Sequence, residues 1–175
     1  MAFRRYAVAL AGLVAACNPR ESRSFVNEWA FVFPRSSAAS LVRQCARPVP
    51  GPVDSTWEPD TVTIGRFERA LGPAIDSAIR ARIGSGDELP DLEEFVRQYG
   101  GLFVGGRKIV YVNGFSILVV IPISFGEDGK PADTTWRHSA LVSCEPAGQW
   151  TWYFGAEYDP ESGEVQSFHF NRSSP

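Results

Sequence analysis

Apolar residues recur at steps of three and four between residues 60 and 83. The series consists of Ile64, Phe67, Leu71, Ile75, Ile79 and Ile83. This spacing puts them on one face of an α-helix, so it predicts an amphipathic helix over this range. Asp60 or Thr63 can cap its first turn. Pro73 lacks a backbone N–H, so we expect a kink or a break there, and glycines in residues 84–88 to end the helix.

A second helical pattern follows directly, and the period then changes. Residues 89–99 place Leu92, Phe95, Val96 and Tyr99 on one helical face, which predicts a shorter helix that Gly100 ends. From residue 102 the apolar positions alternate, as in strands. Residues 102–115 therefore predict a hairpin that turns at Gly105–Gly106, and residues 116–125 a further strand.

The C-terminal part continues the period of two. Strands are predicted over residues 137–145, 150–159 and 164–170, with a tight turn at residues 159–163. One strand face carries an apolar row that we expect to face the core: Trp150, Trp152, Phe154, Ala156 and Tyr158. The sequence thus predicts an α+β fold, with N-terminal helices packed on one face of a mostly antiparallel meander sheet of about 4–6 strands.

The segment before residue 60 reads differently. Residues 25–34 are apolar and predict a strand or a docked segment, and residues 36–45 a short helix. Residues 46–60 contain four prolines and form an extended connector, which we expect Trp57 to attach to the core. We therefore divide the chain into a docked segment with its connector at residues 25–59 and an α+β domain at residues 60–175.

The first residues have the layout of a secretory signal. Arg4 and Arg5 precede a ten-residue apolar run at residues 7–16, and small residues lead into Cys17. Ten helical residues rise only about 15 Å, which is half the thickness of a bilayer core, so the run is too short to span a membrane.

The residues Val14, Ala15, Ala16 and Cys17 resemble the lipobox of bacterial lipoproteins. The resemblance implies cleavage after residue 16, so residues 1–16 are a signal peptide, and diacylglycerol attachment to the Cys17 thiol. Residues 17–24 then form a lipidated tether that holds the protein on a bilayer in the bacterial cell envelope. Asn18, instead of Asp, resembles cargo sent to the outer membrane in Gram-negative bacteria. An ordinary signal peptide with an incidental cysteine is the alternative.

Two cysteines remain once Cys17 is lipidated. Export places them in an oxidising compartment, and two cysteines allow one connectivity. We therefore expect a disulfide between Cys45 and Cys144, and two buried free thiols are the alternative.

A second resemblance covers much of residues 40–171. The stretches FVRQYGGLFVGGRKIVYVNGF and FGAEYDPESGEVQSFHFN resemble a group of uncharacterised bacterial lipoproteins and exported proteins. An upstream cysteine before a Pro-rich linker adds to the likeness. No activity is assigned to that group, so the likeness transfers no catalytic residue.

Searches for catalytic and metal-binding motifs give no site. The two histidines, His138 and His169, have no paired spacing, and the glycines around Lys108 lack the order of a phosphate-binding loop. We therefore expect no metal and no cofactor, and we assign no catalytic residue. The net charge of −3 becomes −5 when Arg4 and Arg5 leave with the signal peptide, which argues against a nucleic-acid partner.

Three residues are candidates for recognition. Arg97 and Tyr99 end the second predicted helix, where a cation suits the helix dipole, and Arg107 follows the hairpin turn. Glu157 and Asp159 share the strand face opposite the aromatic row, and we expect them to form a salt bridge with Arg97 or Arg107.

These observations favour a non-catalytic binding or accessory lipoprotein, whose partners are the bilayer and another envelope protein. Whether the protein is an enzyme stays open, with the balance against it. One alternative is an envelope hydrolase with an unrecognised site around His138 or His169. Another is a small-ligand carrier or an inhibitor.

Overall fold

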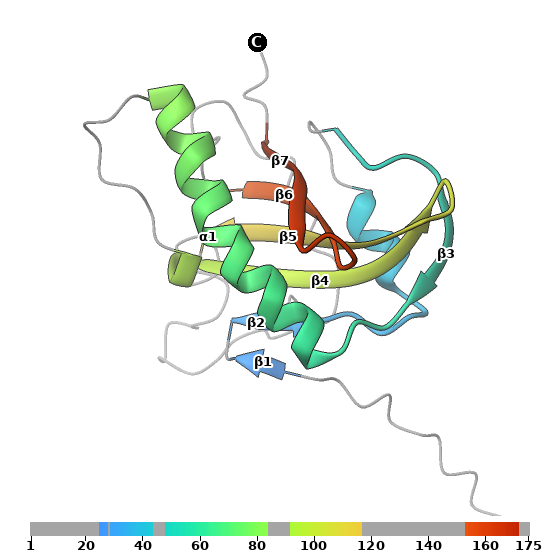
Figure 1. Ribbon diagram of the computed structural model, residues 1–175. Coiled ribbons are helices and arrows are strands. Elements are labelled where there is room, and N and C mark those ends of the chain that lie inside the picture. The colour runs from blue at the N-terminus through green and yellow to red at the C-terminus, as the bar shows by residue number, and fades with distance from the viewer. Residues whose placement is uncertain (1–24, 28, 44–47, 84–91, 117–152, 172–175) are drawn as a thin grey trace, which may run out of the picture.

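A helix crosses one face of a seven-stranded sheet (Figure 1). The computed structural model describes residues 25–27, 29–43, 48–83, 92–116 and 153–171. The helix is α1 (Thr61–Ile83), and two 3-10 turns are η1 (Ala38–Val42) and η2 (Leu92–Glu94). The strands are β1 (Phe25–Asn27), β2 (Ala30–Val32), β3 (Val53–Trp57), β4 (Phe95–Val104), β5 (Arg107–Ser116), β6 (Tyr153–Asp159) and β7 (Glu164–Phe170).

The strand order is β1-β2-β4-β5-β6-β7, and β3 pairs with β4. Strands β4 to β7 form an antiparallel meander. The outer edge of β4 pairs in parallel with β2 at residues 97–99 and antiparallel with β3 at residues 101–104. The fold is thus α+β, with a helix on one face of a mostly antiparallel sheet. Within the described residues there is one α-helix, and three strands precede it, so the expected group of N-terminal helices is wrong in number and order.

Helix α1 has the predicted apolar face. Five of its six periodic residues have at most 1% of their surface exposed: Ile64, Phe67, Leu71, Ile75 and Ile79. They pack on Tyr99, Val112 and Phe154 of the sheet. Asp60 caps the helix, because its Oδ1 accepts a hydrogen bond from the Thr63 N–H at 2.7 Å. Within the described residues, no helix is long and apolar enough to cross a membrane.

The helix does not break at Pro73. Pro73 lies on the exposed side of α1, between the buried residues Leu71 and Ile75. The carbonyl that loses its partner therefore faces water, while the apolar contacts on either side hold both halves on the sheet.

The second predicted helix is wrong. Residues Leu92–Glu94 form only a 3-10 turn, and Phe95 begins β4. Strand β4 pairs on both edges and is buried on both faces, since Phe95 and Tyr99 face α1 while Val96 and Leu102 face the other side. A strand covered on both faces carries apolar residues at nearly every position, so it also satisfies a helical spacing.

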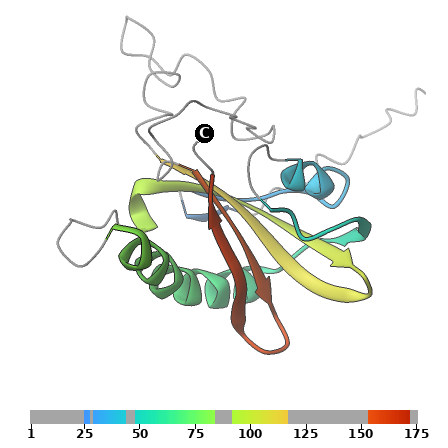
Figure 2. The same cartoon turned by 90° about the horizontal axis from the view of Figure 1, so that it is seen from above.

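The opposite face of the sheet is covered by η1. Ala38 and Leu41 of this turn pack against Leu102, Ile109 and Tyr111. Viewed from above, α1 and η1 lie on opposite sides of the sheet (Figure 2). Residues 25–57 therefore supply strands and a covering turn to the same sheet as the later residues.

Trp57 anchors the Pro-rich connector, as predicted. Its ring lies against Gly101, where an added Cβ would come within 2.7 Å of the ring and 2.5 Å of the Trp57 carbonyl oxygen. The indole N–H donates a hydrogen bond to the Ile109 carbonyl at 3.1 Å. A side chain at residue 101 would lift the indole from the sheet, so glycine is required there.

Both predicted tight turns are present. Gly105 and Gly106 have φ of 55° and 75°, which suits the β4–β5 hairpin, and Gly163 has φ of 77° in the β6–β7 turn. Phe154, Ala156 and Tyr158 face the core, as expected for that part of the apolar row. Several predictions lie outside the described residues: Trp150 and Trp152, Cys17, the Cys45–Cys144 pair, His138, the strand at 137–145, and all of the strand at 116–125 except Ser116, which ends β5.

Candidate functional site

The two candidate recognition residues of β4 lie beneath α1. The Arg97 side chain has 3% of its surface exposed, and its Nε donates to Oε1 of Glu68 on the helix at 2.9 Å. The Tyr99 hydroxyl donates to the same oxygen. The Arg97 Nη1 donates to the carbonyls of Leu92 (2.8 Å) and Phe95. We call Glu68, Arg97 and Tyr99 the helix-anchoring cluster, since it joins α1 to the sheet.

Burial and a neighbouring charge keep the Tyr99 phenol of this cluster protonated. Burial raises the pKa of the Tyr99 phenol well above its ordinary value, and the negative charge of Glu68 raises it further. The phenol therefore stays a hydrogen-bond donor to Glu68. The Phe67 ring packs edge-on against Tyr99, with centroids 5.5 Å apart. Arg97 lies in a strand, so the expected interaction with a helix dipole is wrong.

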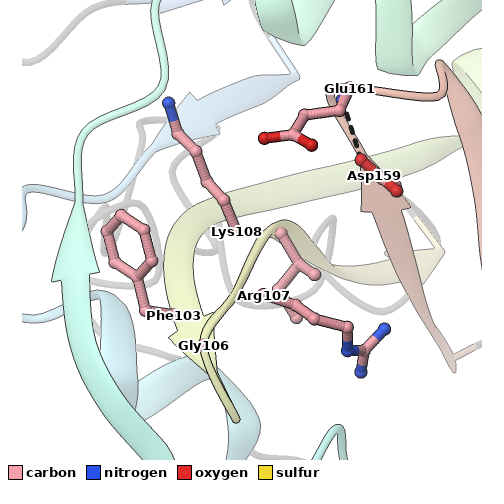
Figure 3. A pocket seen from close by; sticks show the side chains of 7 residues that line it. Phe103, Gly106, Arg107, Lys108, Asp159 and Glu161 are labelled. Atoms are coloured by element: carbon pink, nitrogen blue, oxygen red, sulfur yellow. Dashed lines mark hydrogen bonds between the residues drawn. The ribbon is translucent and has the colours of Figure 1, made fainter.

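Arg107, the third candidate, lies in a different environment. It is exposed at the start of β5 and lines a pocket of about 340 Å³ (Figure 3). Pairing between β5 and β6 ends at Val110 and Tyr158, and the hairpins β4–β5 and β6–β7 diverge beyond this pair (Figure 2). The pocket lies in this divergence and is lined by Phe103, Gly106, Arg107, Lys108, Ile109, Asp159 and Glu161. We call it the hairpin pocket.

The charges of the hairpin pocket come from two different hairpins. Arg107 and Lys108 belong to β5, whereas Asp159 and Glu161 belong to the end of β6 and the turn that follows it (Figure 3). The pocket therefore has its cations on β5 and its carboxylates on β6 and the following turn, which we call its basic side and its acidic side. As consecutive strand residues, Arg107 and Lys108 point to opposite faces of β5 (Figure 3). Within the described part of the chain, no nitrogen of Arg107 or Lys108 lies within 4.0 Å of a carboxylate oxygen, and the ion pair of the anchoring cluster is the one present.

Local contacts hold several of these groups in place. The Lys108 ammonium lies 4.0 Å from the centre of the Trp57 ring. Asp159 Oδ1 accepts hydrogen bonds from the backbone N–H groups of Glu161 (2.7 Å) and Ser162 (3.3 Å). The first of these bonds is the main reason that the pKa of Asp159 is lowered, and the charge of Arg107 adds to the effect. Asp159 is therefore ionised at neutral pH.

The expected partners of Glu157 and Asp159 need correction. Arg97 lies on the face that α1 covers and pairs with Glu68, whereas Glu157 lies on the other face and accepts a hydrogen bond from the Ser167 hydroxyl at 2.9 Å. Asp159 lines the same pocket as Arg107 without a direct ion pair.

The same face carries other polar groups. The buried Asn113 side chain donates to the Gln98 side chain at 3.0 Å, and His169 is exposed on β7 opposite Gly155. In the part of the chain that the structure describes, no three His, Cys, Asp or Glu side chains gather as a metal site.

Sequence reasoning missed Glu68. The residue lies four positions after Ile64 and three before Leu71, so a carboxylate interrupts the apolar face of a predicted helix. That interruption is the signal that could have found it, because a carboxylate at a core position needs a cationic or hydrogen-bonding partner.

Comparisons with protein-family models, with curated proteins and with solved structures found no match to this chain.

Proposed function

We propose that this protein is a lipid-anchored, non-catalytic binding module of the bacterial cell envelope. The lipobox-like residues before Cys17 support the anchor. Only seven residues separate Cys17 from Phe25, where β1 begins. Fully extended, they span at most about 25 Å, so the anchor keeps the sheet close to the bilayer surface. In a Gram-negative cell, Asn18 favours the outer membrane.

The hairpin pocket is the observation that supports binding. Ion pairs between exposed side chains contribute little free energy, so exposed charges remain available to a ligand. Here the cations and the carboxylates line one pocket but stay more than 4.0 Å apart. Such a pocket offers charged groups to a ligand or to a partner envelope protein, which can contact both sides at once.

A hydrolase is the less supported alternative. Ser167, Glu157 and the exposed His169 share one sheet face. A nucleophilic serine requires a base that accepts its proton, commonly a histidine. The Ser167 hydroxyl instead donates to Glu157, which is part of its own β6–β7 ladder.

Analysis of the mature N-terminus tests the anchor. We expect mass spectrometry of the protein from its host to find Cys17 as the first residue, carrying a diacylglycerol thioether. Cys17→Ser should move the protein from the membrane fraction to the soluble fraction, whereas Ser22→Ala in the tether should not. An unmodified Cys17, or a cleavage site elsewhere, contradicts the proposal.

Crosslinking in intact cells then tests the accessory role. We expect a stoichiometric partner to copurify with the wild type and to be lost with Cys17→Ser. A wild-type protein that is anchored but captures no partner contradicts the accessory role while leaving the anchor intact.

A further inference from the structure

We propose that the hairpin pocket binds a zwitterionic amino-acid group, in which an ammonium and a carboxylate are attached to the same carbon. The inference rests on the proposed binding function and names the ligand class of its site. The polarised arrangement of the pocket carries the argument, because its basic side and its acidic side belong to separate hairpins.

The charge balance selects against simple ions. Arg107 and Lys108 attract an anion, but Asp159 and Glu161 line the same pocket and repel it. A simple cation is attracted by the two carboxylates and repelled by Arg107 and Lys108. A ligand that carries both charges places each beside its opposite and adds no net charge to a pocket that is balanced already.

The basic side is suited to a carboxylate. Within the described residues the Arg107 guanidinium has no ion pair, so its fork of N–H donors is available for a bidentate contact. The Lys108 side chain points to the opposite face of β5, where its ammonium lies over the Trp57 ring, so it adds positive charge nearby while Arg107 makes the direct contact.

The acidic side is suited to an ammonium. Asp159 is fixed by two backbone N–H groups that both bond to Oδ1, so these bonds leave Oδ2 for a ligand. Glu161 is exposed on the same turn. An ammonium has three N–H groups, and these carboxylates can accept hydrogen bonds from them.

The size and the lining of the pocket limit the ligand. A volume of about 340 Å³ lies at the lower end of the range for small-molecule sites. Phe103 and Ile109 supply the apolar part of the lining, and the half-buried Phe103 ring lies beside Lys108 (Figure 3). A single amino-acid unit with an aliphatic side chain fits this description. The same group occurs in a free amino acid and at the free end of a diamino-acid residue in a wall peptide.

A matched set of probes tests the charge requirement. The full chain in detergent micelles is titrated with L-leucine, N-acetyl-L-leucine and L-leucine amide, which carry both charges, only the carboxylate and only the ammonium. We expect calorimetry to show saturable leucine binding, and at least about tenfold weaker binding of the other two probes, because each loses one set of charged hydrogen bonds. Equal affinity for N-acetyl-leucine, or no leucine binding, overturns the inference.

Variants then place the ligand in the pocket. We expect Arg107→Gln and Glu161→Gln each to weaken leucine binding about tenfold or more, while Arg80→Gln, an exposed change on α1, leaves it unchanged. Circular dichroism checks that each variant is folded. Leucine binding that Arg107→Gln does not alter overturns the inference.

Two further comparisons complete the test. A peptide that contains diaminopimelate with one free end distinguishes the two sources: tighter binding than leucine assigns the pocket to wall peptides, and weaker binding assigns it to free amino acids. Leucine binding by a protein whose Cys17 is not lipidated contradicts only the proposed anchor. A lipidated protein that does not bind leucine contradicts only this inference.

Discussion

The helix-anchoring cluster and the hairpin pocket use the same kinds of side chain in opposite ways. Beneath α1, Arg97 is buried, with 3% of its side chain exposed, and lies 2.9 Å from Glu68, whose side chain is 17% exposed. At the hairpin tips, Arg107 and Glu161 are exposed and do not meet. Desolvation makes an unpaired buried charge expensive, whereas water stabilises an unpaired surface charge. Charges in the first region therefore stabilise the fold, and those in the second can serve a ligand.

Glu68→Ala is the variant with the largest expected effect on the buried cluster. It leaves the buried Arg97 guanidinium without its carboxylate and the Tyr99 hydroxyl without its acceptor on the helix. We expect the free energy of unfolding to fall by about 3–5 kcal/mol, the usual cost of breaking a buried ion pair. Urea denaturation followed by circular dichroism measures it.

A double substitution separates pairing from packing. Glu68→Met combined with Arg97→Met removes both charges and keeps apolar volume, so we expect it to be more stable than Glu68→Ala alone. A double variant that is less stable than Glu68→Ala contradicts the argument that an unpaired buried charge causes the loss.

Gly114→Ala tests how tightly the sheet packs beside the cluster. Gly114 pairs with Arg97 on β4, and the Phe154 ring covers it so closely that an added Cβ would lie 2.1 Å from a ring carbon. Because Phe154 is fully buried, the ring has no free space to enter. We expect a loss of about 1–3 kcal/mol in the free energy of unfolding.

The matched control is Gly65→Ala in α1. An added Cβ there meets only the flexible end of Arg69, at 3.9 Å. We expect this change to raise the free energy of unfolding by about 0.5–1 kcal/mol, because alanine loses less conformational entropy in a helix. Equal effects of the two glycine substitutions in the same denaturation assay are the result that contradicts this prediction.

Tyr99→Phe removes one hydrogen bond from the cluster and keeps the ring. Glu68 retains its ion pair with Arg97, so we expect a smaller loss of about 1.5 kcal/mol, typical of a hydrogen bond to a charged group. Tyr158→Phe is the control, because within the described residues the Tyr158 hydroxyl makes no hydrogen bond. In thermal unfolding, Tyr99→Phe should have a lower melting temperature than Tyr158→Phe. The reverse order contradicts the hydrogen bond assigned to Tyr99.

The sequence predicts the two regions unequally. The helix at residues 61–83, both glycine turns and the β6–β7 hairpin follow from local periodicity and turn chemistry. Strand β4 does not, because it is buried on both faces and no polar alternation distinguishes it from a helix. The parallel pairing of β2 with β4 joins residues far apart in the chain, and no local pattern encodes it.

The sites show the same division. The sequence pattern places Arg97 and Tyr99 at a helix end, but their environment depends on Glu68, which lies 29 positions before Arg97 on another element. The sequence offers Arg107 as a partner of Glu157 or Asp159. Its neighbours Asp159 and Glu161 reach the same pocket only because the meander brings the β6–β7 turn beside β5. Residue spacing along the chain does not predict tertiary contacts of this kind.

Asp159 gives a smaller, pH-dependent test. Its lowered pKa means that the folded state favours the ionised carboxylate. This stability is present above the ordinary aspartate pKa of about 4, and it is lost as the pH falls through the lower pKa of the folded state. We expect the melting temperature of Asp159→Asn to fall less than that of the wild type between pH 5 and pH 2. Asp76→Asn, on the exposed side of α1, should follow the wild type.

The smallest expected effects are those of Arg107→Gln and Glu161→Gln on stability. Both side chains are exposed and neither forms an ion pair within the described residues, so each change should alter the free energy of unfolding by less than about 0.5 kcal/mol. The same variants should weaken leucine binding, whereas Glu68→Ala should lower stability far more. A loss above about 1 kcal/mol in either pocket variant, measured by urea denaturation, means that these charges support the fold as Glu68 does. A small loss with weakened binding means that the pocket keeps its charges apart for a ligand.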